Sequence, residues 1–392
     1  MAENVPAFGW KRLRLTATAA VPETTDGGCE IAAGDLRLSA DADGTLTLHH
    51  AGRELAGLTA LEDVGDRGDS YDFDAVAEDP GARLRSATCT RVVHPSGIQR
   101  LRVTRTFDVP RCLHEGRERR SAETVPLVIA VEARVAPGVP RVDLAIRVES
   151  TARDHRLRLL FPTGKAAGAF LAATTFDVAE RRAETPDDRA WQQRATPTFP
   201  HQGWVSVNGL TVAAPGLPEA EVTPEGVIAI TLVRGVGWLS RFDLRSRPAP
   251  AGPTMPLEAA QVPRGLEATI ALIPGEGEYT RAQEAECGLR AVLAGGAPLA
   301  AAGHPLLRVE PDSLVLSALK PGEGGTVVRV LNPTNAPVTA RLTPGFSYAG
   351  AQPVRLDEEP AAFALAVRDG AIELEVPPHA LRSVLILPCV DP

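Results

Sequence analysis

Leu101-Arg102-Val103-Thr104-Arg105-Thr106-Phe107 alternates apolar with polar side chains along its whole length. Successive side chains of a β-strand point to opposite faces of a sheet, so this alternation predicts a strand with one buried and one exposed face. Similar runs at residues 90–93, 125–135 and 142–148 flank it, separated by turns that contain Pro and Gly. We assign the charged side chains to a solvated face, as in antiparallel sheets. This part of the chain therefore predicts a large antiparallel β unit.

The same pattern divides the chain into domains. Residues 1–20 are predicted to hold a first strand, from a short alternation, and a linker. Residues 21–290 are predicted to form the large β unit, with an Ala-rich end that is expected to hold one helix and a second linker. At residues 304–392 turns recur at spacings of roughly 8–12 residues, which is typical of a small β-sandwich.

Composition narrows the classes of function. The 392 residues carry a formal net charge of −8, which argues against a nucleic-acid partner. Hydrophobic residues make up 44% of the chain, and no apolar run reaches the roughly 18 residues of a membrane span. The five cysteines are scattered and odd in number, and the N-terminus lacks the pattern of a secretory signal. We therefore expect a cytoplasmic protein with reduced thiols and no membrane partner.

The stretch Glu62-Asp63-Val64-Gly65-Asp66-Arg67-Gly68-Asp69-Ser70-Tyr71-Asp72-Phe73 differs from the predicted strands. Its short polar side chains and two glycines favour turns, and a loop of this kind in a β-rich chain is where function concentrates. One interpretation is that the aspartates only cap turns. Another is a carbohydrate site, because an aromatic ring and planar acceptors suit the two faces of a sugar. The spacing does not match a calcium-binding EF-hand loop.

Several segments resemble, in the same order, the C-terminal β region of glycoside hydrolase family 38, the zinc-dependent α-mannosidases. The resemblance covers most of residues 1–290 and is carried by residues 5–10, 62–73, 155–164, 199–205 and 232–241. It implies an all-β fold: a large antiparallel supersandwich of the galactose-mutarotase-like kind, followed by a small C-terminal β-sandwich. In that family the zinc ligands and the catalytic carboxylates lie on or just after an N-terminal α/β barrel, upstream of these segments. The resemblance therefore implies no catalytic residue and no metal site in this chain.

No pattern in the chain replaces those groups. His49 and His50 are the nearest pair of candidate ligands, but adjacent strand residues point to opposite faces and cannot easily share one ion. We therefore expect no cofactor in this chain and zinc in the complete enzyme. The implied partners are an α-mannoside or related glycan and a catalytic α/β barrel of the same or a neighbouring chain.

The resemblance also implies sugar-binding residues. The Gly-Asp-Ser-Tyr segment looks like the one that places a tyrosine near bound mannose, which here is Tyr71, and Asp69 of the same segment is a further candidate for sugar binding. The Leu-Val-Arg segment looks like the one that contributes an arginine, here Arg234, with Arg241 as a second candidate. A phenol donates to a sugar hydroxyl, and a guanidinium spans adjacent hydroxyls. The alternative is that Tyr71 is a core aromatic residue and that Arg234 pairs with a loop aspartate.

Three hypotheses of function follow. The first is the C-terminal β part of an α-mannosidase, which completes the carbohydrate pocket while mannoside hydrolysis, in mannose metabolism, takes place on the barrel. The second is a stand-alone, non-catalytic carbohydrate-binding or assembly module. The third is an independent hydrolase that uses Asp66, Asp69 or Asp72, but nothing in the sequence selects two of them at the separation that a glycosidase needs. We place the first hypothesis ahead of the other two.

Overall fold

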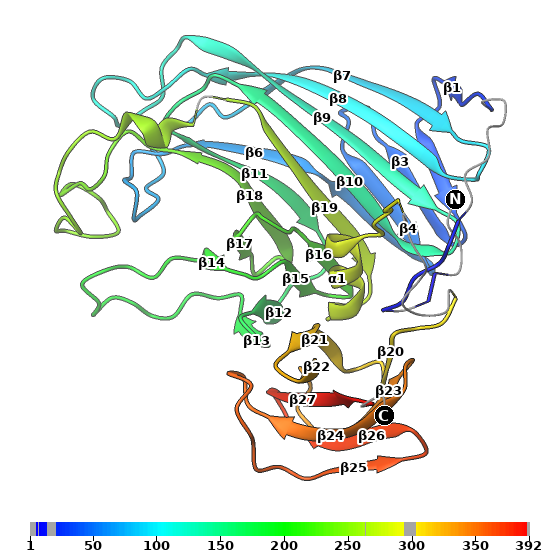
Figure 1. The fold of residues 1–392 in the computed structure, drawn as a ribbon. Helices are drawn as coiled ribbons and strands as arrows, with labels where there is room; N and C mark the ends of the chain where they lie inside the picture. The colour runs from blue at the N-terminus through cyan, green and yellow to red at the C-terminus, as the bar shows by residue number, and fades with distance from the viewer. Residues whose placement is uncertain (1–4, 7, 14–20, 263, 294–302, 390–392) are drawn as a thin grey trace. The chain divides into compact units, whose positions relative to one another are not determined.

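The computed structural model describes residues 5–6, 8–13, 21–262, 264–293 and 303–389 (Figure 1). The chain divides into two compact units. The large unit comprises Val21–Ala172 and Glu180–Cys287, and the small unit comprises Met1–Ala20, Ala173–Ala179 and Gly288–Pro392. The first strand that the sequence predicts falls largely on residues 14–20, which lie outside the described part of the chain.

A long antiparallel sheet contains the alternating segments from which the fold was predicted. Among the described residues its strand order is β1-β7-β8-β9-β10-β19-β16-β15-β12-β13. Along β9 every second side chain from Leu127 to Val135 is buried, as the period of two requires. The strands are β1 (Thr24–Asp26), β7 (Arg83–Val93), β8 (Gln99–Pro110), β9 (Thr124–Ala136), β10 (Val139–Ser150), β12 (Ala169–Thr174), β13 (Asp177–Arg182), β15 (Trp204–Val207), β16 (Leu210–Ala213) and β19 (Leu266–Pro274).

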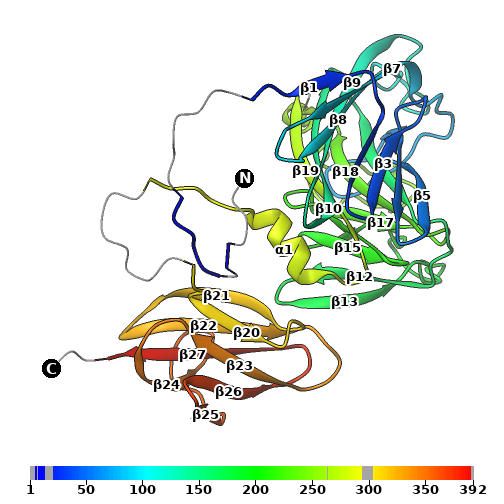
Figure 2. The same cartoon turned by 90° about the vertical axis from the view of Figure 1, so that its right-hand side faces the viewer.

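Two further sheets complete the large unit, and Figures 1 and 2 show the long strands β7 to β10 lying over them. One has the order β14-β17-β18-β11-β6 and the other the order β2-β3-β4-β5 in the described residues. One continuous apolar core contacts all three sheets and includes Leu38, Leu127, Leu159 and Ile230. The strands are β2 (Glu30–Ala33), β3 (Leu36–Ala40), β4 (Leu46–His50), β5 (Arg53–Leu58), β6 (Ala60–Gly65), β11 (His155–Pro162), β14 (Phe199–Pro200), β17 (Glu219–Val222) and β18 (Val227–Gly235).

The small unit is a sandwich of two antiparallel sheets, which confirms the predicted class of fold. In the described residues the orders are β20-β23-β26-β25 and β21-β22-β27-β24. Its core is apolar and includes Leu307, Val330, Leu342, Ile372 and Ile386. The strands are β20 (Leu307–Glu310), β21 (Val315–Gly322), β22 (Gly325–Asn332), β23 (Val338–Pro344), β24 (Tyr348–Val354), β25 (Leu365–Arg368), β26 (Ala371–Val376) and β27 (Ala380–Pro388).

Helix is sparse in the described residues. The helix expected in the Ala-rich segment is α1 (Tyr279–Cys287), and a short 3-10 turn, η1, covers Glu258–Gln261. The all-β class with a large antiparallel supersandwich and a small C-terminal sandwich is therefore confirmed.

The five-stranded sheet brings two loops to one edge. Strands β6 and β18 both run antiparallel to β11, and His155 at the start of β11 pairs with Gly65 at the end of β6 and with Gly235 at the end of β18. The loops that follow β6 and β18 therefore leave the sheet at the same place, although about 170 residues separate them in the sequence.

Candidate functional site

Residues 66–74, here called the aspartate loop, follow β6 directly. The sequence predicted turns from residue 62, but residues 62–65 continue the strand and the irregular backbone begins at Asp66. The loop closes on itself, because the Arg67 amide donates to the Asp74 carbonyl and the Asp69 amide donates to the Asp72 carbonyl. At Gly68 an added β-carbon would lie 2.0 Å from the Asp72 carbonyl oxygen. Only glycine fits this tight closure.

Asp66 is buried at the base of the aspartate loop. Its carboxylate accepts hydrogen bonds from two loop amides and from Arg234 Nε at 2.7 Å. Arg234 Nη2 also donates to the carbonyls of Asp69 and Asp72, at 2.7 and 2.6 Å. Burial raises the pKa of Asp66, although the positive charge of Arg234 opposes that shift. Arg234, a predicted sugar-binding residue, thus holds the loop through an ion pair and two carbonyls.

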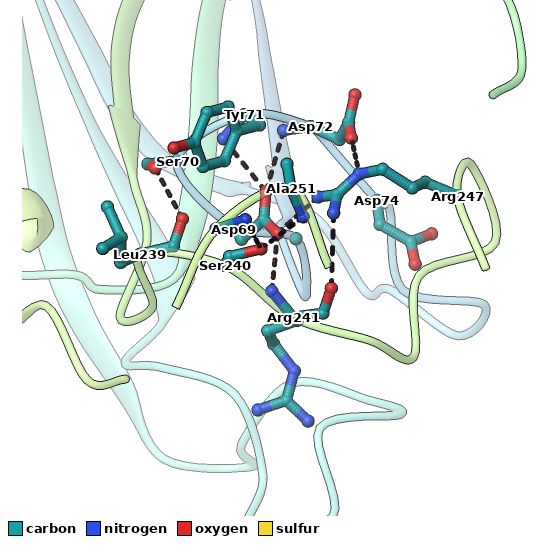
Figure 3. Close-up of polar contacts among 12 residues, drawn as sticks. Asp69, Ser70, Tyr71, Asp72, Asp74, Leu239, Ser240, Arg241, Arg247 and Ala251 are labelled. Carbon is teal, nitrogen blue, oxygen red and sulfur yellow. Dashed lines mark hydrogen bonds and ion pairs between the residues drawn. The ribbon is translucent and has the colours of Figure 1, made fainter. Parts of the chain in front are cut away.

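Asp69 lies at the centre of the loop and both of its carboxylate oxygens are occupied (Figure 3). Oδ1 accepts from the amides of Tyr71 and Asp72, each at 3.0 Å. Oδ2 accepts from the Arg241 amide at 2.7 Å and from Arg247 Nη2 at 2.5 Å. Burial opposes ionisation of Asp69, but these hydrogen bonds outweigh it and hold its pKa below the usual value. The carboxylate is therefore charged and joins two loops.

Arg247 also joins the aspartate loop to the segment after β18. Its Nε lies 2.6 Å from Asp72 Oδ2, and its Nη1 donates to the Ala249 carbonyl at 2.7 Å. With the bond to Asp69, one guanidinium bridges two aspartates of the aspartate loop from the segment after β18. The sequence interpretation missed Arg247.

Arg241 contributes mainly through its backbone. Its amide binds Asp69, while its side chain pairs with Asp243 at 2.6 Å. The guanidinium lies over the Trp238 ring, with its carbon 4.5 Å from the ring centroid. Asp243 and Trp238 thus hold this predicted sugar-binding side chain.

Tyr71 is the exposed aromatic residue of the aspartate loop, with 56% of its surface accessible. Its backbone is held on both sides: its own amide binds Asp69, and the preceding Ser70 donates from its hydroxyl to the Leu239 carbonyl at 2.6 Å (Figure 3). The alternative of a core aromatic residue is therefore not what the structure shows. The loop presents a phenol on a backbone that the surrounding contacts fix.

A second buried charge cluster lies just below the loop. Asp63 of β6 accepts from Arg120 Nη1 at 2.5 Å and contacts His155 Nδ1 at 2.5 Å. Burial opposes ionisation of Asp63, but the hydrogen bonds and charges of His155 and Arg120 outweigh it and hold the pKa of the carboxyl below its usual value. Sequence analysis did not identify this cluster, which fixes the end of the strand from which the loop starts.

The described residues do not fit a zinc site. They contain no group of three His, Cys, Asp or Glu side chains arranged to hold a metal ion. His49 pairs with Glu54 and His50 with Asp35, so the two neighbouring histidines have separate partners. No helix among the described residues is long and apolar enough to cross a membrane.

The predicted sugar-binding residues thus come together at one place. Tyr71 and Asp69 belong to the aspartate loop, and Arg234 and the Arg241 amide hold that loop. Their arrangement presents one exposed phenol on a rigid base, while the carboxylates and guanidinia are largely paired with each other. The arrangement therefore positions the Tyr71 hydroxyl as a hydrogen-bonding group and the Tyr71 ring as an aromatic surface.

Comparisons with known proteins identify the family of the large unit. Residues 31–238 match the model of the glycosyl hydrolases family 38 C-terminal domain. A protein of Halalkalibacterium halodurans named "Putative mannosylglycerate hydrolase" is 31% identical over 255 residues, which is 59% of this chain and 26% of that protein. The chain therefore spans about a quarter of the length of this curated relative.

Solved structures show the same fold. An alpha-mannosidase from Enterococcus faecalis V583 superposes with a TM-score of 0.75 at 22% identity, over 92% of this chain and 42% of that one. A glycosyl hydrolase family 38 protein from Enterococcus faecalis gives a TM-score of 0.74 at 22% identity, over 95% of this chain and 46% of that one. In both, the similarity covers nearly all of this chain and less than half of the other.

Proposed function

Because the chain belongs to the C-terminal domain family of the family 38 glycosyl hydrolases, we propose that it forms the carbohydrate-binding β part of an enzyme that hydrolyses α-mannosides. In this proposal the large unit completes a sugar pocket whose other side is a catalytic α/β barrel, in the same or a neighbouring chain. The names of the similar proteins and the resemblance of the loop segments support the substrate class. We also propose a cytoplasmic location, on the scattered cysteines.

The observation that carries the proposal is the way the aspartate loop presents Tyr71. The phenol is exposed while the backbone around it is tied by Asp69, Arg234 and Arg247. Holding a binding group on a rigid base reduces the entropy that is lost when a ligand binds. A tyrosine with only a packing role would not need this support. We propose that the Tyr71 hydroxyl bonds a mannose hydroxyl.

Asp69 and Arg234 then act as positioning residues in this proposal. Asp69 has no carboxylate oxygen left for a sugar, because each oxygen already accepts two hydrogen bonds. The same contacts disfavour a hydrolase built on Asp66, Asp69 and Asp72, since a nucleophile needs a free oxygen directed at the substrate. We therefore propose that the nucleophile, the acid and the zinc ligands lie on the barrel.

Hydrolysis of a chromogenic α-mannoside tests this proposal. The purified chain is assayed with added zinc, alone and together with a family 38 N-terminal barrel supplied as a separate protein. We expect no turnover by the chain alone, and turnover by the mixture that exceeds that of the barrel alone. Tyr71→Phe should lower the turnover of the mixture, whereas Tyr348→Phe in the small unit serves as a matched control and should not.

Two outcomes would contradict the proposal. Turnover by the chain alone that is lost in Asp69→Asn would show that the catalytic groups lie here. Mannoside binding by the chain alone, with no effect on the barrel, would instead favour a stand-alone binding module.

A further inference from the structure

A cleft of about 690 Å³ opens in the large unit beside the aspartate loop. Its lining includes three arginines, Arg111, Arg117 and Arg153, and the side of Trp238. The Trp238 carbonyl accepts a hydrogen bond from the Ser70 amide, so the cleft shares a wall with the aspartate loop. None of the sugar-binding residues predicted from the sequence lines this cleft.

Two of the three arginines are neutralised by carboxylates. Arg111 lies 2.6 Å from Glu123, and Arg153 pairs with Glu258, which also lines the cleft. Their charges are therefore largely balanced within the protein. The third arginine, Arg117, is different.

Arg117 forms no ion pair with any residue that the structure describes. Its Nη2 donates to the carbonyls of Arg67 and Gly68, at 2.5 and 3.3 Å, which fixes the guanidinium against the aspartate loop. Asp154 lines the same cleft, but it accepts from Gln261 Nε2 at 2.7 Å and does not pair with Arg117. The remaining N–H groups of Arg117 make no hydrogen bond to the described residues. These N–H groups can donate to the oxygens of a carboxylate or phosphate.

The backbone of Arg117 supports a role for its side chain. Arg117 lies at the tip of a short hairpin that the bridge between Leu113 and Arg120 closes, and its φ is 62°. This left-handed conformation is unfavourable for a residue with a β-carbon and is ordinarily filled by glycine. Strained backbone of this type is concentrated at binding sites.

The charge of Arg117 is only partly compensated. Burial and the nearby positive charge of Arg241 lower its pKa, and the carboxylates of Asp154, Asp243 and Asp66 oppose this shift without cancelling it. A bound anion would act in the same direction as these carboxylates. The cleft therefore combines a fixed guanidinium that has no ion pair with an aromatic wall.

We propose that this cleft binds the carboxylate or phosphate group of a charged sugar derivative, with Arg117 paired to the anion and Trp238 packed on the sugar. The inference rests on the proposed function only for the sugar part of the ligand. The anion part stands on the geometry of Arg117 alone, so the two can be tested separately.

Isothermal titration of the full chain with four probes tests the inference: inorganic phosphate, mannose 6-phosphate, mannuronic acid and methyl α-mannoside. We expect the charged sugars to bind at least tenfold tighter than methyl α-mannoside, and the tighter of the two identifies a phosphate or a carboxylate as the natural group. Arg117→Gln should remove this advantage and abolish phosphate binding. Arg147→Gln is a matched control at an exposed arginine of β10 and should change each Kd less than twofold.

A second variant keeps the test decisive if Arg117→Gln fails to fold. Thr151→Glu places a carboxylate on an exposed position of the cleft lining and should remove the same advantage while Arg117 remains. Charged probes that bind no tighter than methyl α-mannoside, or an advantage that survives both substitutions, would overturn the inference. If methyl α-mannoside binds and phosphate does not, only the inference fails. If phosphate binds through Arg117 and the chain does not raise the turnover of the barrel, the proposed function fails instead.

Discussion

The two units differ in whether their carboxylates and ion pairs are buried. In the small unit the ion pairs lie at the surface, as between Arg341 and Glu373, and no carboxylate of its described residues is buried. In the large unit Asp63, Asp66 and Asp69 are buried and paired with arginines. Burying an ion pair costs desolvation that its own attraction only partly returns, so a β-sandwich gains little stability from it.

The difference indicates what the buried charges do. The small unit shows that an apolar core is enough to hold a sandwich of this type together. The buried pairs of the large unit gather at the sheet edge where the aspartate loop and the segment after β18 meet. We interpret them as fixing one loop conformation, which is the use best supported for buried polar groups in proteins.

Asp63→Ala should give the largest loss of stability. It leaves the guanidinium of Arg120 buried without its closest partner, and loss of one partner of a buried pair costs about 3–5 kcal/mol. Glu373→Ala, which breaks a surface pair in the small unit, should cost less than about 1 kcal/mol. Urea denaturation followed by circular dichroism measures both. Equal losses would remove the contrast between the units.

His201 should make the stability of the large unit depend on pH. Its ring is buried, and burial lowers its pKa from 6.5 to about 4. The unfolded chain therefore binds a proton between these values that the folded chain does not, so the free energy of unfolding falls as the pH is lowered from about 6.5 to 4. The loss approaches about 3 kcal/mol.

Urea denaturation at several pH values compares the wild type with His201→Leu. The variant should lose this part of the pH dependence. The pKa of Asp63 is held below its usual value of 3.8, so Asp63 affects stability only at a pH below the window of His201. If the free energy of unfolding of His201→Leu falls with pH between 6.5 and 4 as steeply as that of the wild type, other groups cause the acid sensitivity.

Asp69→Asn should loosen the aspartate loop. The amide cannot accept all four hydrogen bonds, so the Arg241 amide or Arg247 loses its partner, at a cost of about 1–3 kcal/mol. Hydrogen exchange at residues 66–74 should become faster, while exchange in the small unit stays the same. Asp243→Asn, at a partly exposed carboxylate, is the control with little expected change. A loop that exchanges as slowly as in the wild type would mean that Asp69 does not fix it.

Tyr71→Phe should have the smallest effect on stability and a clear effect on binding. The side chain is exposed, so the free energy of unfolding should change by less than about 0.5 kcal/mol. Loss of one hydrogen bond should weaken mannoside binding by up to about tenfold. Calorimetric titration with methyl α-mannoside measures the change. Unaltered binding would show that the Tyr71 phenol is not part of the binding site whose loop the buried charges hold.

The sequence was informative where the determining interactions are local. Alternation predicted β8, β9 and β10, because in a half-buried strand each residue is apolar or polar according to the face on which it lies. The helix α1 followed from local composition in the same way. The class of fold could therefore be predicted.

The pairing within the site could not be predicted in this way. Asp66 and Arg234 are 168 residues apart, and nothing in either segment specifies the partner. One signal was present: Arg241, Arg245 and Arg247 form an Arg-rich segment whose charge is complementary to the aspartate loop. Arg120 and His155 carried no such signal, because isolated residues in strands and loops do not show which carboxylate they will meet.

The long separation between the aspartate loop and its arginines also has a consequence for biosynthesis. A ribosome completes the N-terminal part of a domain first, so the loop emerges well before the segment that holds Arg234 and Arg247. Until those residues are made, its aspartates have only loop amides and water as partners. The surface that presents Tyr71 is therefore set only near the end of translation of the large unit, and a nascent chain that stops early would carry the loop without its final shape.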